Sequence, residues 1–132
     1  MTNNSRSSQA TPRASFVVVA NRLAVERTMD DEDQPGWRTA RDGAWIGWHG
    51  FADEVLEPFE HDGIEMVPVA LSEEEVAEFY EGMSNATLWP LYHDSVAYPE
   101  YHREWWDAYT RVNRRFAEAA AEVAEDGGTV WV

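Results

Sequence analysis

One short segment near the start of the chain restricts its fold more than any other. Residues 16–20 have the sequence Phe-Val-Val-Val-Ala and contain no polar side chain. A strand with one exposed face alternates apolar and polar residues, whereas a strand covered on both faces is a continuous apolar run, as in parallel sheets. Because helices cover such sheets, the segment predicts an α/β layer architecture.

The length and composition of the chain fit one folded unit. Its 132 residues are 44% hydrophobic, which is enough apolar material for a modest core. Residues 1–15 are instead mainly Ser, Thr, Asn, Arg and Gln. So little apolar surface cannot offset the entropy lost on ordering. We therefore expect a loose, disordered tail over residues 1–15 and a single domain over residues 16–132.

Three further segments have the character of strands. Residues 44–48 and 64–70 are predicted strands, and the second contains Pro68 and alternates in polarity, which favours the edge of a sheet. Residues 129–132 begin an apolar strand in which the chain stops. A strand of this kind is typical of a larger domain that has been truncated.

Two helices are predicted between these strands. The first starts after Ser72, because Ser72 and Glu75 form an S-x-x-E capping box, and it is expected to end near Gly82. The second is expected from about Pro99 to Asp126, where Gly127-Gly128 would stop it. Its apolar residues recur at steps of three or four and form one continuous stripe: Trp105, Tyr109, Val112, Phe116, Ala119 and Val123.

The charge of the chain restricts its partners. There are 25 acidic and 10 basic side chains, so the formal net charge is -15. This charge argues against nucleic acid or an anionic membrane as a partner, and an anionic ligand must be held by a few local cations. The absence of cysteine fits a reducing cytoplasm, and residues 16–20 are too few to span a membrane. We expect a cytoplasmic protein.

Residues 26–36 form an acidic, turn-rich segment that contains Asp30-Asp31-Glu32-Asp33. The segment is predicted to be a solvated loop. A divalent-cation site is the alternative, but the carboxylates have no recognisable ligand register. The four histidines also lack metal-binding spacing, so we predict no metal site.

Arg22 is the first candidate ligand-binding residue. It directly follows the first predicted strand, and therefore stands at the carboxyl edge of a parallel sheet, where α/β folds bind ligands. The planar fork of guanidinium donors suits a phosphate group. A surface arginine that pairs with one of the many carboxylates is the alternative.

Three aromatic residues, Trp48, Tyr80 and Trp89, are the other candidates. Aromatic faces pack on the apolar patches of a pyranose, while phenol and indole donors reach hydroxyl or phosphate groups. Tyr80 and Trp89 flank a turn-prone Ser84-Asn85 pair, so residues 82–93 can line a sugar pocket. Plain core packing is the alternative for these aromatic residues.

Three motifs occur in an order that resembles a known family. They are Ala20-Asn21-Arg22, Trp45-Ile46-Gly47-Trp48, and Tyr80-x-x-x-Ser84-Asn85-x-x-Leu88-Trp89-Pro90. The similarity continues through Trp105-Trp106-Asp107 to the last residue. From residue 16 to residue 132 the chain resembles the amino-terminal part of the trehalose-6-phosphate synthases, glycosyltransferase family 20.

The resemblance implies a fold, a reaction and a binding site. The fold is the Rossmann-like amino-terminal half of a GT-B glycosyltransferase. The reaction transfers glucose with retention from a nucleotide sugar, usually UDP-glucose, to glucose 6-phosphate, and requires no metal or other cofactor. By motif, Arg22 would hold the acceptor phosphate together with the Tyr80 hydroxyl, and Trp48 and Trp89 would shape the glucose 6-phosphate pocket.

Two parts of the family pattern have no match here. Between Arg22 and Trp45 the family has a Gly-Gly loop and a helix, whereas this chain has only Gly36 and Gly43, so we expect an internal deletion. The half that binds the nucleotide sugar is also missing. We therefore predict an incomplete domain that is inactive alone, marginally stable and able to associate with itself through exposed apolar surface. A non-catalytic sugar-phosphate-binding or regulatory module is the alternative.

Overall fold

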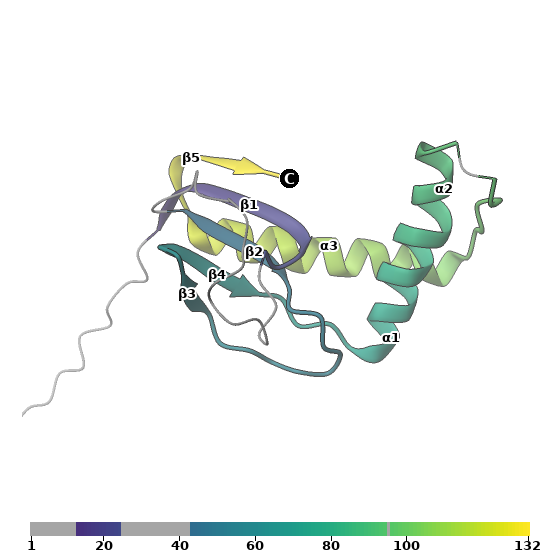
Figure 1. Ribbon diagram of the computed structural model, residues 1–132, viewed down its shortest axis with the longest axis horizontal. Coiled ribbons are helices and arrows are strands. Elements are labelled where there is room, and N and C mark those ends of the chain that lie inside the picture. Colours follow the sequence, from purple (N-terminus) through teal and green to yellow (C-terminus); the bar gives the residue numbers. More distant parts are fainter. Residues whose placement is uncertain (1–12, 25–42, 95) are drawn as a thin grey trace, which may run out of the picture.

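The computed structural model describes residues 13–24, 43–94 and 96–132, and a five-stranded sheet forms its centre (Figure 1). The strands are β1 (Ala14–Arg22), β2 (Ala44–Trp48), β3 (Phe59–His61), β4 (Ile64–Pro68) and β5 (Ala124–Trp131). Their order across the sheet is β3-β4-β2-β1-β5, and all neighbouring pairs are parallel except β3 and β4. The predicted α/β fold class is confirmed.

Strand β1 lies in the interior of the sheet, as its apolar run predicts. It pairs in parallel with both β2 and β5. It begins two residues before the predicted domain boundary at residue 16, because Ala14 pairs with Ala124 of β5. Residues 1–12 of the predicted tail lie outside the described residues. Strand β2 has the bounds that were predicted for it.

The predicted edge position of β4 is wrong. β4 lies between β2 and β3, and β3 forms the edge of the sheet. β3 pairs with β4 in an antiparallel hairpin whose turn consists of Asp62 and Gly63, at φ 53° and 79°. Two residues with positive φ suit the twist of a short hairpin, and Asp-Gly is a strong sequence signal for such a turn. The interpretation of Pro68 as an edge marker overlooked this signal.

The first helix is about twice as long as predicted. It runs without a break through α1 (Glu73–Glu75), the π-helical segment η1 (Val76–Leu88) and α2 (Trp89–Tyr92). The predicted capping box is present, with both the Ser72 N–H to Glu75 and the Glu75 N–H to Ser72 hydrogen bonds at 3.1 Å. The predicted end near Gly82 is wrong, because Gly82 is buried against the Trp105 ring in the middle of the helix.

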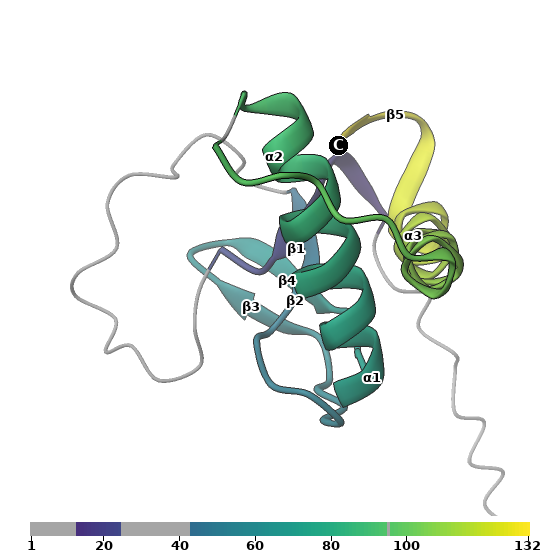
Figure 2. The same ribbon diagram turned by 90° about the vertical axis from the view of Figure 1, so that its right-hand side faces the viewer.

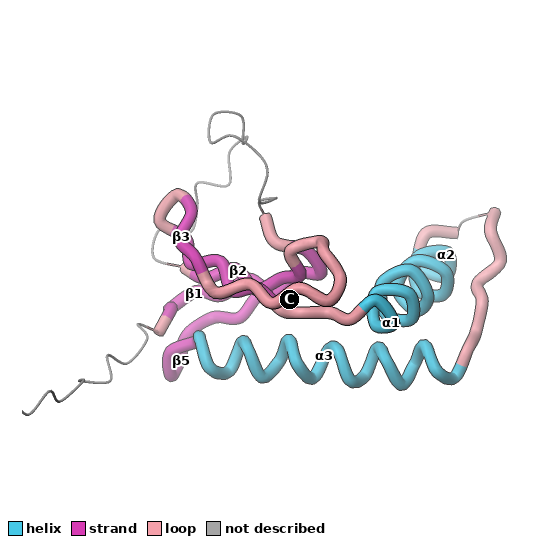
Figure 3. Tube along the Cα trace, turned by 90° about the horizontal axis from the view of Figure 1, so that it is seen from below, coloured by secondary structure: helices cyan, strands magenta, loops and turns pink. Residues whose placement is uncertain are grey.

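The second helix, α3 (Arg103–Val123), is shorter at both ends than the predicted range from Pro99 to Asp126. Gly127 and Gly128 do not stop it, since both lie within β5. Helix α3 runs along one face of the sheet, and the first helix stands beyond the end of the strands (Figures 1 to 3). No helix in the described part of the chain is both long and apolar enough to cross a membrane.

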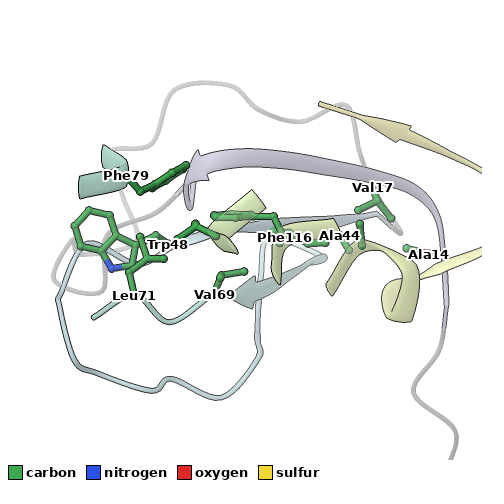
Figure 4. Close-up of a cluster of buried hydrophobic side chains, with 11 residues drawn as sticks. Ala14, Val17, Ala44, Trp48, Val69, Leu71, Phe79 and Phe116 are labelled. Atoms are coloured by element: carbon green, nitrogen blue, oxygen red, sulfur yellow. The ribbon is translucent and has the colours of Figure 1, made fainter. Parts of the chain in front are cut away.

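The main hydrophobic core lies between α3 and the sheet. It joins buried residues of β1 and β2 to the α3 stripe and to Phe79 of η1, and its larger members include Val17, Ile46, Trp48, Leu71, Val112 and Phe116 (Figure 4). A second, smaller cluster is built around Leu23, Ile64 and Met66. Residues 16–20 are covered unevenly, because only Val17 of that run is fully buried.

Candidate functional site

The candidate site lies at the carboxyl edge of the parallel strands. Arg22 is the last residue of β1 and Trp48 is the last residue of the adjacent β2. The two strand ends are joined by a hydrogen bond from Leu23 N–H to the Trp48 carbonyl at 3.0 Å, and Trp45 Nε1 donates to the Arg22 carbonyl at 3.0 Å. The predicted position of Arg22 at the carboxyl edge of the parallel sheet is therefore confirmed, and its role in ligand binding stays a prediction.

The structure brings three of the four candidate residues together. The Arg22 Cζ atom lies 5.1 Å from the centre of the Trp48 ring, which is a cation–π distance. The Trp48 ring also contacts Tyr80, in an edge-on arrangement with 5.5 Å between ring centres. Three segments far apart in the sequence thus form one cluster: Arg22, Trp48 and Tyr80.

Trp48 itself is a core residue. It is only 5% exposed, belongs to the main hydrophobic core, and donates its Nε1 hydrogen to the Phe51 carbonyl at 3.0 Å. Figure 4 shows its ring among Leu71 and Phe79. In this environment the indole supports the Arg22 guanidinium rather than presenting an open face. Of the two interpretations of Trp48 from the sequence, core packing describes its surroundings.

Trp89 lies apart from that cluster. It is 57% exposed and stacks on His93 with 3.6 Å between ring centres. Trp89 and Tyr80 are nine residues apart in one helix, which is about two and a half turns of an α-helix and would place them on opposite faces. The helix is π-helical here, as the hydrogen bond from Trp89 N–H to the Ser84 carbonyl shows. A π-helix has more residues per turn, so nine residues make about two turns. The two aromatic residues therefore share a side of the helix.

The Ser84-Asn85 pair is not a turn. Both residues lie inside η1, so the expectation that a turn separates Tyr80 from Trp89 is wrong. The segment that follows the helix folds back on it, because Thr87 donates to the Glu100 carbonyl and Glu100 N–H donates to the Ala86 carbonyl at 3.0 Å. Residues 82–93 therefore belong to the helix and its C-terminal cap, and they do not form a loop.

The loop after β2 is fixed by His49, which is 4% exposed. Phe51 N–H donates to His49 Nδ1 at 3.4 Å, so the imidazole proton is assigned to Nε2, which donates to the Glu54 carbonyl at 3.1 Å. Both ring nitrogens are therefore engaged in holding the loop. This loop follows Trp48 directly and borders the Arg22 cluster.

The sequence interpretation missed an ion-pair network between the first helix and α3. Arg115 of α3 makes two parallel hydrogen bonds of 2.8 Å to the two carboxylate oxygens of Glu75, and Arg111 adds a third at 3.2 Å. The hydrogen bond from Arg115 is the largest cause of a lowered Glu75 pKa, and together with those from Ser72 and Arg111 it outweighs the opposing effect of burial, so that the pKa falls from 4.5 to about 2. The capping box identified Glu75, and the apolar stripe identified α3. Neither pattern predicts that they pair, because Glu75 is 36 positions from Arg111 and 40 from Arg115.

No cluster of His, Asp and Glu that could hold a metal ion occurs among the described residues. The acidic segment 26–36, for which a divalent-cation site was the alternative interpretation, lies outside them. The expected deletion between Arg22 and Trp45 also falls on undescribed residues, 25–42, and stays a prediction.

Comparison with known proteins gives one consistent family. The model of glycosyltransferase family 20 matches residues 10–132. The trehalose-6-phosphate synthase of Mycolicibacterium smegmatis is 51% identical over 131 aligned residues, which cover 89% of this chain and 26% of that protein.

Solved structures agree in fold with this chain. An α,α-trehalose-phosphate synthase (UDP-forming) from Burkholderia vietnamiensis is 25% identical, with a TM-score of 0.72 over 91% of this chain and 28% of that one. The Burkholderia xenovorans enzyme in complex with glucose-6-phosphate is 26% identical, with a TM-score of 0.68 over 89% of this chain and 27% of that one. The chain therefore spans about a quarter of the length of the relatives it matches.

Proposed function

This chain belongs to glycosyltransferase family 20, and we propose that its described residues form part of the acceptor site of a trehalose-6-phosphate synthase. The reaction proposed for the complete enzyme is retaining transfer of glucose from UDP-glucose to glucose 6-phosphate. The UDP-forming relative and the relative bound to glucose-6-phosphate support this choice of substrates.

The observation that carries the proposal is the placement of Arg22 over Trp48. A guanidinium at the carboxyl edge of a parallel sheet, against the face of an aromatic ring, has the charge and the planar donor geometry that suit a phosphate group. The net charge of -15 makes a local cation necessary for any anionic ligand. Arg22 would therefore bind the 6-phosphate of the acceptor.

The aromatic residues would have different parts in this site. Buried Trp48 would support the guanidinium, and half-buried Tyr80, which touches the Trp48 ring, would direct its hydroxyl at the same phosphate. Exposed Trp89, on the same side of the helix as Tyr80, would border the glucose ring. All four residues belong to the acceptor side, and we propose that the 132-residue chain alone binds glucose 6-phosphate without turnover.

Calorimetric titration of the chain with glucose 6-phosphate and with unphosphorylated glucose tests this proposal. We expect saturable binding of glucose 6-phosphate and much weaker binding of glucose. Arg22→Ala should weaken glucose 6-phosphate binding by roughly 10- to 100-fold, since a charge-assisted pair contributes about 1.5–3 kcal/mol. Arg114→Ala, which removes the same charge from an exposed position on α3, should leave the affinity within about twofold.

Two results would contradict the proposal. One is the absence of saturable glucose 6-phosphate binding, and the other is equal affinity for the two sugars in both wild type and Arg22→Ala. Formation of trehalose 6-phosphate from UDP-glucose and glucose 6-phosphate by the 132-residue chain would contradict the prediction that it does not catalyse alone.

A further inference from the structure

A glycine outside the four candidate residues lies directly against the Arg22 side chain. Gly50 is two residues beyond the end of β2. A Cβ atom placed on Gly50 would stand 2.6 Å from Arg22 Nη2 and 3.1 Å from Arg22 Cζ. Non-bonded carbon and nitrogen atoms do not approach this closely, so a side chain at this position requires the guanidinium to move.

The guanidinium lies between Gly50 and its aromatic neighbour, Trp48. Its Cζ atom already lies 5.1 Å from the centre of the Trp48 ring. That ring is buried in the main core, and its Nε1 hydrogen bonds to the Phe51 carbonyl. The indole and the Gly50 backbone are thus two fixed boundaries of the space that the guanidinium occupies.

The loop that contains Gly50 is itself held in place. His49, buried at 4% exposure, accepts from Phe51 N–H and donates to the Glu54 carbonyl, which anchors the residues on both sides of Gly50. Gly50 has a φ of 101°, a conformation that other residues rarely adopt. A substitution at Gly50 therefore has two separable effects, backbone strain and contact with Arg22.

We propose that Gly50 is a positioning residue for Arg22, because its missing side chain leaves the space in which the guanidinium lies over Trp48. The role of this placement in binding the acceptor phosphate rests on the proposed function. The placement itself does not depend on any ligand.

Gly63→Ala is a matched control for Gly50→Ala. Gly63 also has a positive φ, 79°, but a Cβ atom placed on it meets nothing within 4 Å. The control therefore also places an alanine at a positive φ, but without the contact. A difference between the two variants reports the effect on Arg22.

The first measurement is the side-chain Nε–H resonance of Arg22 in the ligand-free chain, identified by its disappearance in Arg22→Lys. We expect the wild-type resonance to be displaced by the ring current of Trp48. Gly50→Ala should move it toward the position of exposed arginines, whereas Gly63→Ala should leave it in place. An unmoved Arg22 resonance in Gly50→Ala would overturn the proposal.

The second measurement is glucose 6-phosphate affinity. Gly50→Ala should weaken it by about tenfold, equivalent to about 1.4 kcal/mol, while Gly63→Ala should retain the wild-type value. If the wild type binds and Gly50→Ala binds equally well, the role of Gly50 in the site is refuted. If the wild type does not bind, the proposed function fails instead, and the resonance measurement alone decides the placement of Arg22.

A double-mutant cycle covers the case in which Gly50→Ala is too unstable for these experiments. If the contact with the guanidinium destabilises the variant, the loss of melting temperature on Gly50→Ala should shrink in an Arg22→Ala background. If Gly50→Ala lowers the melting temperature equally in the wild-type and Arg22→Ala backgrounds, the loss arises from backbone strain only and the proposal is overturned.

Discussion

Glu75 links the two helices of the molecule through hydrogen bonds. Its carboxylate accepts hydrogen bonds from Ser72 N–H at the start of the first helix and from Arg111 and Arg115 of α3. The side chain is 9% exposed, and Arg115 also donates to the Ala70 carbonyl at 2.7 Å. The cap of the helix that contains Tyr80 is therefore anchored to α3 and to the end of β4.

This network predicts a specific pH dependence of stability. The pKa of Glu75 is lowered in the folded chain from 4.5 to about 2, so its contribution to stability is complete above pH 4.5 and disappears as the pH falls toward 2. We expect Glu75→Gln to reduce the free energy of unfolding by about 2–3 kcal/mol at neutral pH. Urea unfolding of both proteins between pH 6 and pH 3 measures the difference.

The comparison with Glu75→Gln is needed because other carboxylates also titrate in this range. The difference between the two proteins should shrink steadily below pH 4.5. A pH-independent difference would show that the carboxylate charge does not stabilise the fold. Glu74→Gln, at an exposed position in the same turn, serves as the control and should change stability by less than about 0.5 kcal/mol.

The first helix is the element that determines the geometry of the candidate site. Its π-helical segment brings Tyr80 and Trp89 to one side, and its middle is packed closely against α3. At the point of contact, a Cβ atom on Gly82 would stand 2.6 Å from Trp105 Cδ2 and 2.8 Å from Cε2. Gly82 therefore permits the approach of the two helices, which explains a glycine in the middle of this helix.

Gly82→Ala should destabilise the chain even though alanine is the better helix former. The added methyl group collides with the Trp105 ring, and overpacking of this kind costs about 1–3 kcal/mol. Asn85→Ala, three residues along the same helix at an exposed position, should instead stabilise the chain by up to about 0.5 kcal/mol. Urea denaturation of both variants tests this prediction, and a stabilised Gly82→Ala would refute the close contact.

At the scale of the whole molecule, the sheet formed by the described residues ends in an apolar edge strand. Strand β5 forms one end of the strand order, and Val130 and Trp131 are 43% and 67% exposed. Apolar edge strands are sites of pairing with another chain. The net charge of -15 opposes association, so we expect self-association to be weak at low salt and to increase as salt screens the repulsion.

Sedimentation velocity at increasing protein concentration measures this association. Val130→Lys on β5 should reduce it, because a lysine on an edge strand disfavours pairing. Ala121→Lys adds the same charge at an exposed position of α3 and should have a smaller effect. A chain that remains monomeric at high concentration and high salt would contradict the expected self-association.

Local sequence signals determined much of this fold. The apolar run of β1, the bounds of β2, the capping box at Ser72 and the stripe of α3 all depend on residues close together in the sequence, where propensity, periodicity and hydrogen bonding act directly. The position of Arg22 at the carboxyl edge of the sheet could also be predicted locally, because Arg22 comes at the end of the β1 strand. Family motifs added the candidate residues Trp48, Tyr80 and Trp89.

Contacts between distant segments decided the rest. Gly82 and Ser84-Asn85 have turn-forming character, but all three lie inside the helix, and Gly82 packs against Trp105 there. Tertiary contacts outweigh propensities of about 1 kcal/mol or less per residue. The pairing of Glu75 with Arg115, the burial of Trp48 beneath Arg22 and the space at Gly50 likewise depend on residues that meet only after folding. The sequence by itself determined most of the elements, and the tertiary structure decided the extent of the first helix and which side chains meet.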